Sequence, residues 1–263
     1  FIGYVISAGD AFSWVKLGWL VLGGFLVTGS SNGFNQIIEI DSDKLMDRTA
    51  NRPLPQNRMS VVEAVLLASA MGIAGIFILT FKLNPMSGIL GVAALLSYTV
   101  IYTPLKKVTP LAVFVGAFPG AIPPLLGHVA ATNGFGEIQF QGILLFAIQF
   151  IWQFPHFWAI AWVVDDDYKK AGFNMLPSKG GRDKSSAFQI LTYTLFLLPI
   201  SLSPVFFRMS GSLSAVLITA AGAVFAFQAY RLFKDCTIKA AQQLMFGSFI
   251  YLPIVQLAIM IGK

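Results

Sequence analysis

The amino-acid sequence predicts an all-α membrane protein that crosses the bilayer many times, and three observations support this fold class. Of its 263 residues, 56% are hydrophobic and only 11% are charged, whereas a soluble domain carries about 25% charged residues. Apolar stretches of about 20 residues, the length of a membrane-spanning helix, recur along the chain. The basic residues gather in alternate connections between these stretches. We therefore expect lipid to be the solvent of this chain.

Eight stretches are long and apolar enough to span the bilayer as helices. They cover residues 13–40, 60–81, 86–102, 109–130, 138–164, 185–207, 213–233 and 240–261. Residues 1–8 are apolar but too short to span, and we interpret them as the end of a ninth helix whose start is absent from this sequence. The prediction is one polytopic bundle of nine transmembrane helices, the first of them truncated.

The 18 lysine and arginine residues divide unevenly between the two sides of such a bundle. One set of alternate connections holds 14 of them, and the other side keeps Lys16, Lys82, Arg208 and Lys263. Since basic loops stay in the cytoplasm, the first set is predicted to be cytoplasmic. Nine of the 12 acidic residues lie on the same side. A basic cytoplasmic loop does not need acidic residues to set the topology, so we expect these acids to have a chemical role.

The remaining composition excludes several other classes. The net charge of +6 does not indicate a nucleic-acid partner, because in a membrane protein the distribution of charge matters more than its sum. Cys236 is the only cysteine, so neither a disulfide framework nor a thiol metal cluster is expected. Residues 1–7 show no cleavable signal. The lack of a transit-like segment favours a bacterial plasma membrane over a mitochondrial inner membrane.

The connection after the first long stretch contains an amide and two carboxylates at helical spacing. Asn35, Glu39 and Asp43 lie at i, i+4 and i+8, so on a continuous helix they share one face. Oxygen ligands of this kind suit Mg²⁺, which takes one or two carboxylates together with phosphate oxygens. Polar residues at the end of an apolar helix are costly and usually functional. The alternative is a solvated loop whose acids and bases pair with one another.

Three arginines follow in the same connection, at Arg48, Arg52 and Arg58. Guanidinium groups bind phosphate oxygens in a bidentate manner. Together with the oxygen ligands before them, these arginines predict a site for a metal-bound diphosphate at the membrane surface.

This segment resembles the first signature of the UbiA-type intramembrane prenyltransferase superfamily. The pattern N-x-x-x-(D/E)-x-x-x-D occurs as Asn35, Glu39 and Asp43, and R-T-x-N-R-P-L-P begins at Arg48. Members are nine-helix enzymes that join an isoprenoid diphosphate to an aromatic or porphyrin acceptor. The resemblance implies a UbiA-type bundle whose active-site cavity opens to the cytoplasmic side. It also implies Mg²⁺ held by Asn35, Glu39 and Asp43, with Arg48 and Arg52 on the diphosphate.

A second polar segment follows the stretch 138–164 and resembles the haem-farnesylating branch of that superfamily. W-Q-x-P-H-F-W begins at Trp152, and D-Y-x-x-A-G-x-x-M-L-P begins at Asp167. Other members carry D-x-x-x-D here, and this chain does not, so which aspartate meets a metal stays open. We expect Asp166 and Asp167 to be catalytic acids, Asp167 to be a metal ligand, and Lys170 to contact the diphosphate.

Two further elements match the superfamily. Tyr102 and Lys106 fit its Y-x-x-x-K pattern, which implies that both contact the diphosphate and that Lys106 is catalytic; the alternative for Lys106 is a charge that only sets topology. His156 is expected to contact the haem acceptor. Its alternative is a buried imidazole that forms a hydrogen bond between helices.

The resemblance implies one transmembrane prenyltransferase domain over residues 1–263. Its reaction would transfer a farnesyl group from farnesyl diphosphate to the vinyl group of haem B, giving haem O, by Mg²⁺-assisted ionisation of the diphosphate. The implied partners are these two substrates, the bilayer, and either haem A synthase or proteins that assemble terminal oxidases. No nucleic acid is expected.

Two alternatives remain open. A quinone-type prenyltransferase acting on 4-hydroxybenzoate-like acceptors would share the first signature but should carry D-x-x-x-D in the second. An ion-coupled transporter would use the acids as a relay, and it predicts acids near the middle of the membrane.

Overall fold

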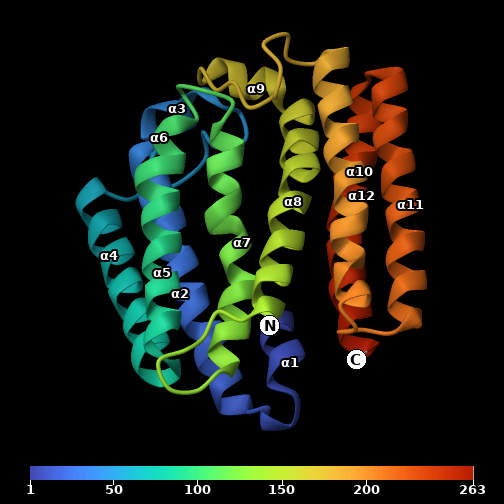
Figure 1. The fold of residues 1–263 in the computed structure, drawn as a ribbon. Helices are drawn as coiled ribbons and strands as arrows, with labels where there is room; N and C mark the ends of the chain where they lie inside the picture. Colours follow the sequence, from blue (N-terminus) through green and yellow to red (C-terminus); the bar gives the residue numbers. More distant parts are fainter. Residues whose placement is uncertain (263) are drawn as a thin grey trace.

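The computed structural model describes residues 1–262 as a bundle of long helices, with no β-strand in that range (Figure 1). The long helices are α2 (Trp14–Ile38), α4 (Val61–Ile78), α5 (Pro85–Leu96), α7 (Ala112–Ala131), α8 (Phe140–Val163), α10 (Lys184–Phe206), α11 (Ser212–Asp235) and α12 (Ile238–Ile261). The short ones are α1 (Ile2–Ala8), α3 (Ile40–Leu45), α6 (Thr103–Leu105), α9 (Asp165–Lys170), the 3₁₀ turn η1 (Gly9–Ala11) and the π-helical segments η2 (Leu79–Leu83) and η3 (Ser97–Tyr102).

Among the described residues, seven helical segments are long and apolar enough to cross a membrane. In two of them a π-helical segment extends the helix, so that the spans run over Val61–Leu83 and Pro85–Leu105. Helix α2, with 25 residues, is an eighth long helix, and it buries Ser30, Ser31 and Asn35 inside the bundle. The eight predicted stretches therefore correspond to eight long helices. The count of nine stays a prediction, because α1 has seven residues.

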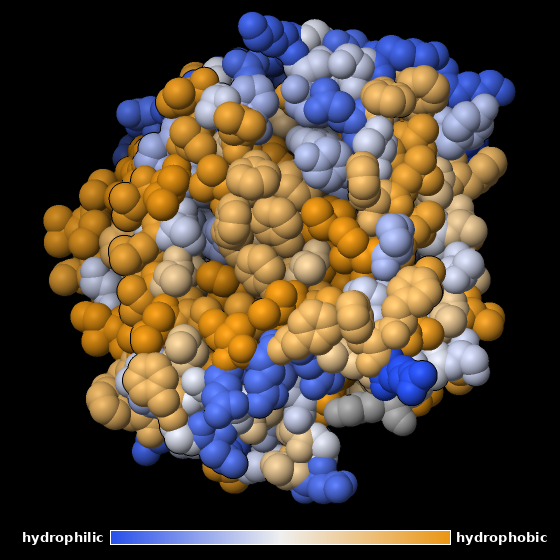
Figure 2. All heavy atoms as spheres, viewed as in Figure 1, coloured by the Kyte–Doolittle hydropathy of each residue, from blue (hydrophilic) through white to orange (hydrophobic). Residues whose placement is uncertain are grey.

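The connections that carry most of the basic residues meet at one end of the bundle. Helices α3, α6 and α9 lie together at the top of Figure 1, and α3 contacts α9. Figure 2 shows an apolar band across the face in view, with hydrophilic residues toward the two ends of the molecule. This is the surface of an integral membrane protein, since apolar side chains face lipid and polar ones face water.

Helices α2 and α4 approach closely because small residues line their contact. The buried face of α4 consists of Ala64, Ala68, Gly72 and Gly75. A Cβ atom added at Gly75 would lie 2.9 Å from the carbonyl oxygen of Gly23 on α2. Transmembrane helices use small residues in this way to bring their backbones together.

We expect Gly75→Ala to destabilise the protein by about 1–3 kcal/mol, because backbone atoms must move apart to admit the methyl group. The measurement is the unfolding midpoint of the purified protein in detergent. Gly18→Ala on α2 is the matched control, since a Cβ there meets nothing within 4 Å. Equal midpoints for the two variants would contradict this account of the α2–α4 contact.

Candidate active site

The three oxygen-bearing residues predicted to share a helix face line one cavity. Helix α2 ends at Ile38 and the chain bends at Glu39 (φ −102°, ψ 13°) before α3 begins. Two i to i+4 hydrogen bonds continue through the bend, from the Glu39 N–H to the Asn35 carbonyl (3.0 Å) and from the Asp43 N–H to the Glu39 carbonyl (2.7 Å). All three side chains are buried. The side chains are therefore not solvated as the alternative of a loop expects, although both acids do pair with basic residues, as that alternative also expects.

The amide of Asn35 has a defined orientation. Its nitrogen donates to the Thr103 hydroxyl (3.1 Å), and that hydroxyl donates its own proton to the Tyr98 carbonyl (2.8 Å). Because Thr103 has one hydroxyl proton, it can only accept from Asn35. The amide oxygen of Asn35 is thus left for a ligand of the cavity.

Two cations neutralise the two buried acids. Lys106 donates to Glu39 Oε2 (3.1 Å), and its Nζ lies 2.8 Å from Oε1 without hydrogen-bond geometry. Arg52 donates to Asp43 Oδ2 at 2.7 Å, while Asp43 Oδ1 is buried without a hydrogen-bond partner. A buried carboxylate oxygen without a hydrogen-bond partner is costly even when the charge of the group is paired. Asp43 Oδ1 is therefore available to a ligand of this site.

These groups surround a cavity of about 180 Å³, which we call the diphosphate cavity. Its lining residues are Asn35, Glu39, Asp43, Met46, Arg48, Arg52, Tyr98, Tyr102, Lys106, Phe157, Tyr168, Phe173 and Met175. They come from α2, α3, η3, α8, α9 and the loops beside them. Arg48, unlike Arg52 and Lys106, forms no ion pair with a described residue; its guanidinium lies 5.8 Å from the Tyr168 ring centre.

Burial lowers the pKa of Lys106 from its usual value, although the neighbouring Glu39 carboxylate acts in the opposite direction. The side chain is only 11% exposed. A protonated amine is the form that can pair with phosphate oxygens. Because its pKa is lowered, Lys106 loses its positive charge at a lower pH than a lysine in water does.

If the cavity binds the diphosphate that the sequence resemblance implies, we expect kcat/KM for that substrate to fall on the alkaline side below about pH 10.4, the usual pKa of a lysine. The profile of kcat/KM reports the free enzyme, in which Lys106 is buried. Lys106→Arg should keep some activity and move this limb to higher pH, because arginine stays protonated. Lys107→Arg at the exposed neighbouring position is the control. If the alkaline limb does not move in Lys106→Arg, a group other than Lys106 causes it.

The acids of α9 lie outside the diphosphate cavity. Asp165 is buried and pairs with Lys169 (2.7 Å), and Asp166 is exposed and pairs with Arg182 (2.8 Å). Asp167 accepts the backbone N–H groups of Asp47 and Arg48. The structure thus brings the two polar segments into contact, but none of the three aspartates lines the cavity.

Lys170, expected on the diphosphate, also lies outside the lining of the cavity. Its Nζ is 2.6 Å from Asp47 Oδ2 and 3.4 Å from Asp167 Oδ1. Burial alone would raise the pKa of Asp167, but the two backbone N–H groups and Lys170 outweigh it and hold that pKa below its usual value.

His156 lies on α8 below this surface and is buried. Its Nδ1 is 2.7 Å from the Ser248 hydroxyl of α12, and its ring stacks on Trp152 with centres 4.3 Å apart. It does not line the diphosphate cavity, but the next residue, Phe157, does. The contact with Ser248 is the hydrogen bond between helices that was expected as the alternative to haem contact. It engages Nδ1 and does not involve Nε2.

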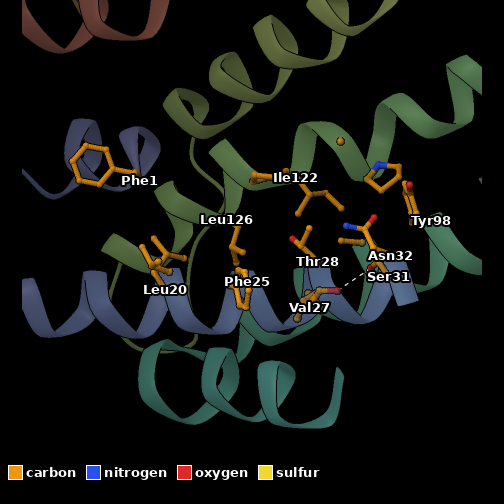
Figure 3. A pocket seen from close by; sticks show the side chains of 17 residues that line it. Phe1, Leu20, Phe25, Val27, Thr28, Ser31, Asn32, Tyr98, Ile122 and Leu126 are labelled. Atoms are coloured by element: carbon orange, nitrogen blue, oxygen red, sulfur yellow. Dashed lines mark hydrogen bonds between the residues drawn. The ribbon is translucent and has the colours of Figure 1, made fainter. Parts of the chain in front are cut away.

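A second cavity, of about 340 Å³, lies among α2, α5 and α7, and we call it the apolar cavity (Figure 3). In Figure 3 Ser31, Asn32 and Tyr98 lie toward one end, and Phe1 and Leu20 lie toward the other. Helix α7 contributes residues of its proline-containing part, namely Pro119, Gly120, Ile122, Pro123 and Leu126. Tyr98 lines both cavities. The two cavities, one lined by charged and one by apolar residues, are therefore neighbours that share the Tyr98 side chain.

The residues present fit Mg²⁺. No group of three or more His, Cys, Asp or Glu side chains that could hold a metal occurs within residues 1–262. Mg²⁺, however, uses one or two carboxylates and takes its other oxygens from phosphate and water. Glu39, Asp43 and the oxygen of Asn35 provide that set, and the unpartnered Asp43 Oδ1 is the observation that supports it.

Several lining residues were not assigned a role from the sequence. Tyr98 precedes Tyr102 by four positions, and the π-helical segment η3 brings their rings to 5.1 Å from each other. Such segments are frequent at functional sites, but nothing in the sequence marks one here. Tyr168, Phe173 and Met175 belong to the second signature, and the spacing of that motif was the signal that could have marked them as lining residues.

The fold is that of an integral membrane protein with a charged, partly buried cavity at one end of its bundle, and comparison with known proteins supplies its family. The profile of the UbiA prenyltransferase family matches residues 1–252. The chain is 51% identical over 262 residues to the protoheme IX farnesyltransferase of Cytophaga hutchinsonii, covering 100% of this chain and 91% of that protein. The chain therefore belongs to the UbiA prenyltransferase family and is a prenyltransferase.

Solved structures share this fold. One, described as digeranylgeranylglyceryl phosphate synthase, has a TM-score of 0.82 at 23% identity over 99% of this chain and 90% of its own. A UbiA homologue from Archaeoglobus fulgidus bound to DMAPP and Mg²⁺ has a TM-score of 0.72 at 16% identity over 98% of this chain and 92% of its own. With the seven apolar spans and bacterial relatives, the chain is an integral protein of the plasma membrane.

Proposed function

We propose that this enzyme transfers a farnesyl group from farnesyl diphosphate to the vinyl group of haem B and so forms haem O. The observation that carries the diphosphate part is the unpartnered, buried Asp43 oxygen in a cavity lined by Glu39 and three cations. The acceptor is proposed from the protoheme IX farnesyltransferase of Cytophaga hutchinsonii, which is 51% identical.

The cations bind the leaving group. Arg48 forms no ion pair with a described residue, so its charge is available to phosphate, while Arg52 and Lys106 lie beside the acids that they neutralise. Asn35, Glu39 and Asp43 would hold Mg²⁺, the ion found with DMAPP in the Archaeoglobus fulgidus homologue. When bound, Mg²⁺ supplies Lewis-acid stabilisation of the charge that develops on the departing diphosphate.

The aromatic side chains of the diphosphate cavity act on the cation that forms when the donor's C1–O bond breaks. The C1–O bond breaks, and its electron pair leaves with the diphosphate. Tyr98, Tyr102 and Phe157 line the cavity and exclude water from the allylic cation that forms. The faces of their rings also attract this cation. The vinyl electron pair then bonds to C1, and a water molecule adds to the resulting cation and loses a proton. The product carries a hydroxyethylfarnesyl side chain.

The apolar cavity is the proposed place for the isoprenoid chain. It shares the lining residue Tyr98 with the diphosphate cavity and is lined mostly by apolar side chains of α2, α5 and α7. This arrangement would leave C1 beside Tyr98. His156 is proposed to contact the haem through Nε2, because Nδ1 is engaged with Ser248. The protein partners proposed are haem A synthase or proteins that assemble terminal oxidases, which would receive the product.

The test is to incubate membranes containing the protein with haem B, farnesyl diphosphate and Mg²⁺ and to analyse the porphyrins by mass spectrometry. We expect the mass of haem O, and no product when Mg²⁺ is removed with a chelator. The quinone-type alternative predicts prenylated 4-hydroxybenzoate instead. That product, without haem O, would overturn the proposed acceptor.

A further inference from the structure

The carboxylate of Asp167 is held by the backbone of the first polar segment. Its Oδ1 accepts the backbone N–H of Asp47 at 2.8 Å, and its Oδ2 accepts the backbone N–H of Arg48 at 3.3 Å. Lys170 joins the same group, with its Nζ 2.6 Å from Asp47 Oδ2 and 3.4 Å from Asp167 Oδ1. We call Asp47, Arg48, Asp167 and Lys170 the interloop clasp.

The clasp joins two segments that are distant in sequence, and both line the diphosphate cavity. On one side, Met46 and Arg48 flank Asp47 and line the cavity; on the other, Tyr168 follows Asp167 and also lines it. The Arg48 guanidinium lies 5.8 Å from the Tyr168 ring centre. Fixing the backbone of Arg48 therefore fixes where its side chain enters the cavity.

The carboxylate of Asp167 does not fit the role of a metal ligand. Each of its oxygens already accepts a backbone N–H, and the side chain is absent from the cavity lining among the described residues. A carboxylate oxygen that accepts one N–H keeps a second lone pair, so the position of Asp167 outside the cavity lining, and not its hydrogen bonds alone, separates it from the metal site. Glu39 and Asp43 differ, because both line the cavity and Asp43 Oδ1 is unpartnered.

We propose that Asp167 is a positioning residue that holds the Asp47–Arg48 backbone against α9, so that Arg48 meets the diphosphate, and that it is not a ligand of Mg²⁺. The inference rests on the proposed function, since Arg48 acts here on the diphosphate of the prenyl donor. The two acidic segments therefore have different roles. The first carries the oxygen ligands, and the second holds Arg48 in position.

The kinetic test uses Asp167→Asn in the full-length enzyme. The asparagine keeps the size of the side chain, but its amide nitrogen cannot accept an N–H. We expect the KM for farnesyl diphosphate to rise about 10-fold, as for the loss of about 1.4 kcal/mol of binding, with kcat within about twofold of wild type. The Mg²⁺ concentration that gives half-maximal activity should not change. A metal ligand would instead shift that concentration and lower kcat.

Two further measurements separate positioning from a general loss of structure. In hydrogen–deuterium exchange of the ligand-free protein, peptides over 46–52 should exchange faster in Asp167→Asn, while peptides of α7 and α8 should not change. Arg48→Ala should raise KM, and adding Asp167→Asn to it should have little further effect, because the clasp acts through Arg48. Asp235→Asn, which removes an acid from the end of α11, is the matched control for charge.

Unchanged exchange over 46–52, additive effects of the two substitutions, or a shifted Mg²⁺ dependence would each overturn the positioning role. Failure of the proposed function gives a different result. In that case wild-type enzyme does not turn over farnesyl diphosphate at all, while the exchange difference between wild type and Asp167→Asn remains.

Discussion

Replacing Asp43 by asparagine is expected to reduce kcat at least about 100-fold while the helical bundle stays folded. Asp43 is fully buried, and its Oδ1 has no partner within the protein. The substitution keeps the shape of the side chain but removes the charge that would attract Mg²⁺. Arg52, which now pairs with Asp43, is partly exposed and can be solvated. The rate is measured as haem O formed at saturating farnesyl diphosphate and Mg²⁺.

The control for this experiment is Asp235→Asn, at the end of α11 outside the diphosphate cavity. Its kcat should equal that of wild type. Far-ultraviolet circular dichroism and elution volume in detergent establish that Asp43→Asn is folded. A folded Asp43→Asn protein with wild-type kcat would remove Asp43 from the metal site.

The second large effect is expected at the Lys106–Glu39 pair. Lys106→Met should destabilise the protein by about 3–5 kcal/mol, because it leaves the buried Glu39 carboxylate without its counter-charge. The double variant Lys106→Met/Glu39→Gln should recover most of this loss, since it buries no charge at that position. Neither variant should turn over substrate, because both lack a cation for the diphosphate and one also lacks a metal ligand.

The measurements are the unfolding midpoint in detergent and the rate of haem O formation. Lys107→Met is the matched control, because Lys107 carries the same charge at the next position but is exposed. It should change neither quantity. If Lys106→Met and the double variant unfold at the same midpoint, the ion pair does not stabilise the fold. If Lys106→Met keeps full activity, Lys106 only sets topology.

Much of the fold follows from the sequence because solvation by lipid acts on each helix separately. Hydropathy and the alternation of basic loops were enough to place eight long helices and to bring α3, α6 and α9 to one end. The ends of the helices were less predictable. Residues 103–105 continue the π-helical segment η3, for example, and nothing in the local hydropathy of 86–102 indicates this continuation.

The first polar segment was also accessible, since the spacing of Asn35, Glu39 and Asp43 is a property of one helix. The bend at Glu39 did not separate them, because the i to i+4 hydrogen bonds continue through it. The partners of these residues depend on tertiary structure. Thr103, which orients the Asn35 amide, lies 68 positions along the chain, and no local pattern predicts the pairing.

The second polar segment shows the limit of reasoning from residue type. A run of three aspartates suggests metal ligands, yet none of the three lines the cavity, and Asp165, Asp166 and Asp167 are engaged instead by Lys169, Arg182 and two backbone N–H groups. Those donors come from other turns and loops. The choice between ligand and positioning residue therefore required three-dimensional geometry.

The location of the acids also bears on the transporter alternative, which predicts acids near the middle of the membrane. Glu39, Asp43 and Asp165 gather where α3 and α9 meet, at one end of the bundle, and Asp10 and Glu137 lie in connections at the other end (Figure 1). Membership of the UbiA prenyltransferase family accounts for this arrangement, and a relay across the bilayer does not.

The most direct test of the account is a structure of the protein with Mn²⁺ and farnesyl thiodiphosphate, an analogue that ionises slowly. Anomalous scattering would locate the manganese independently of the surrounding density. We predict a manganese peak within coordination distance of Glu39 and Asp43, with the diphosphate between it and Arg48. A peak at Asp165–Asp167 instead, or a diphosphate bound outside this cavity, would contradict the assignment of the site.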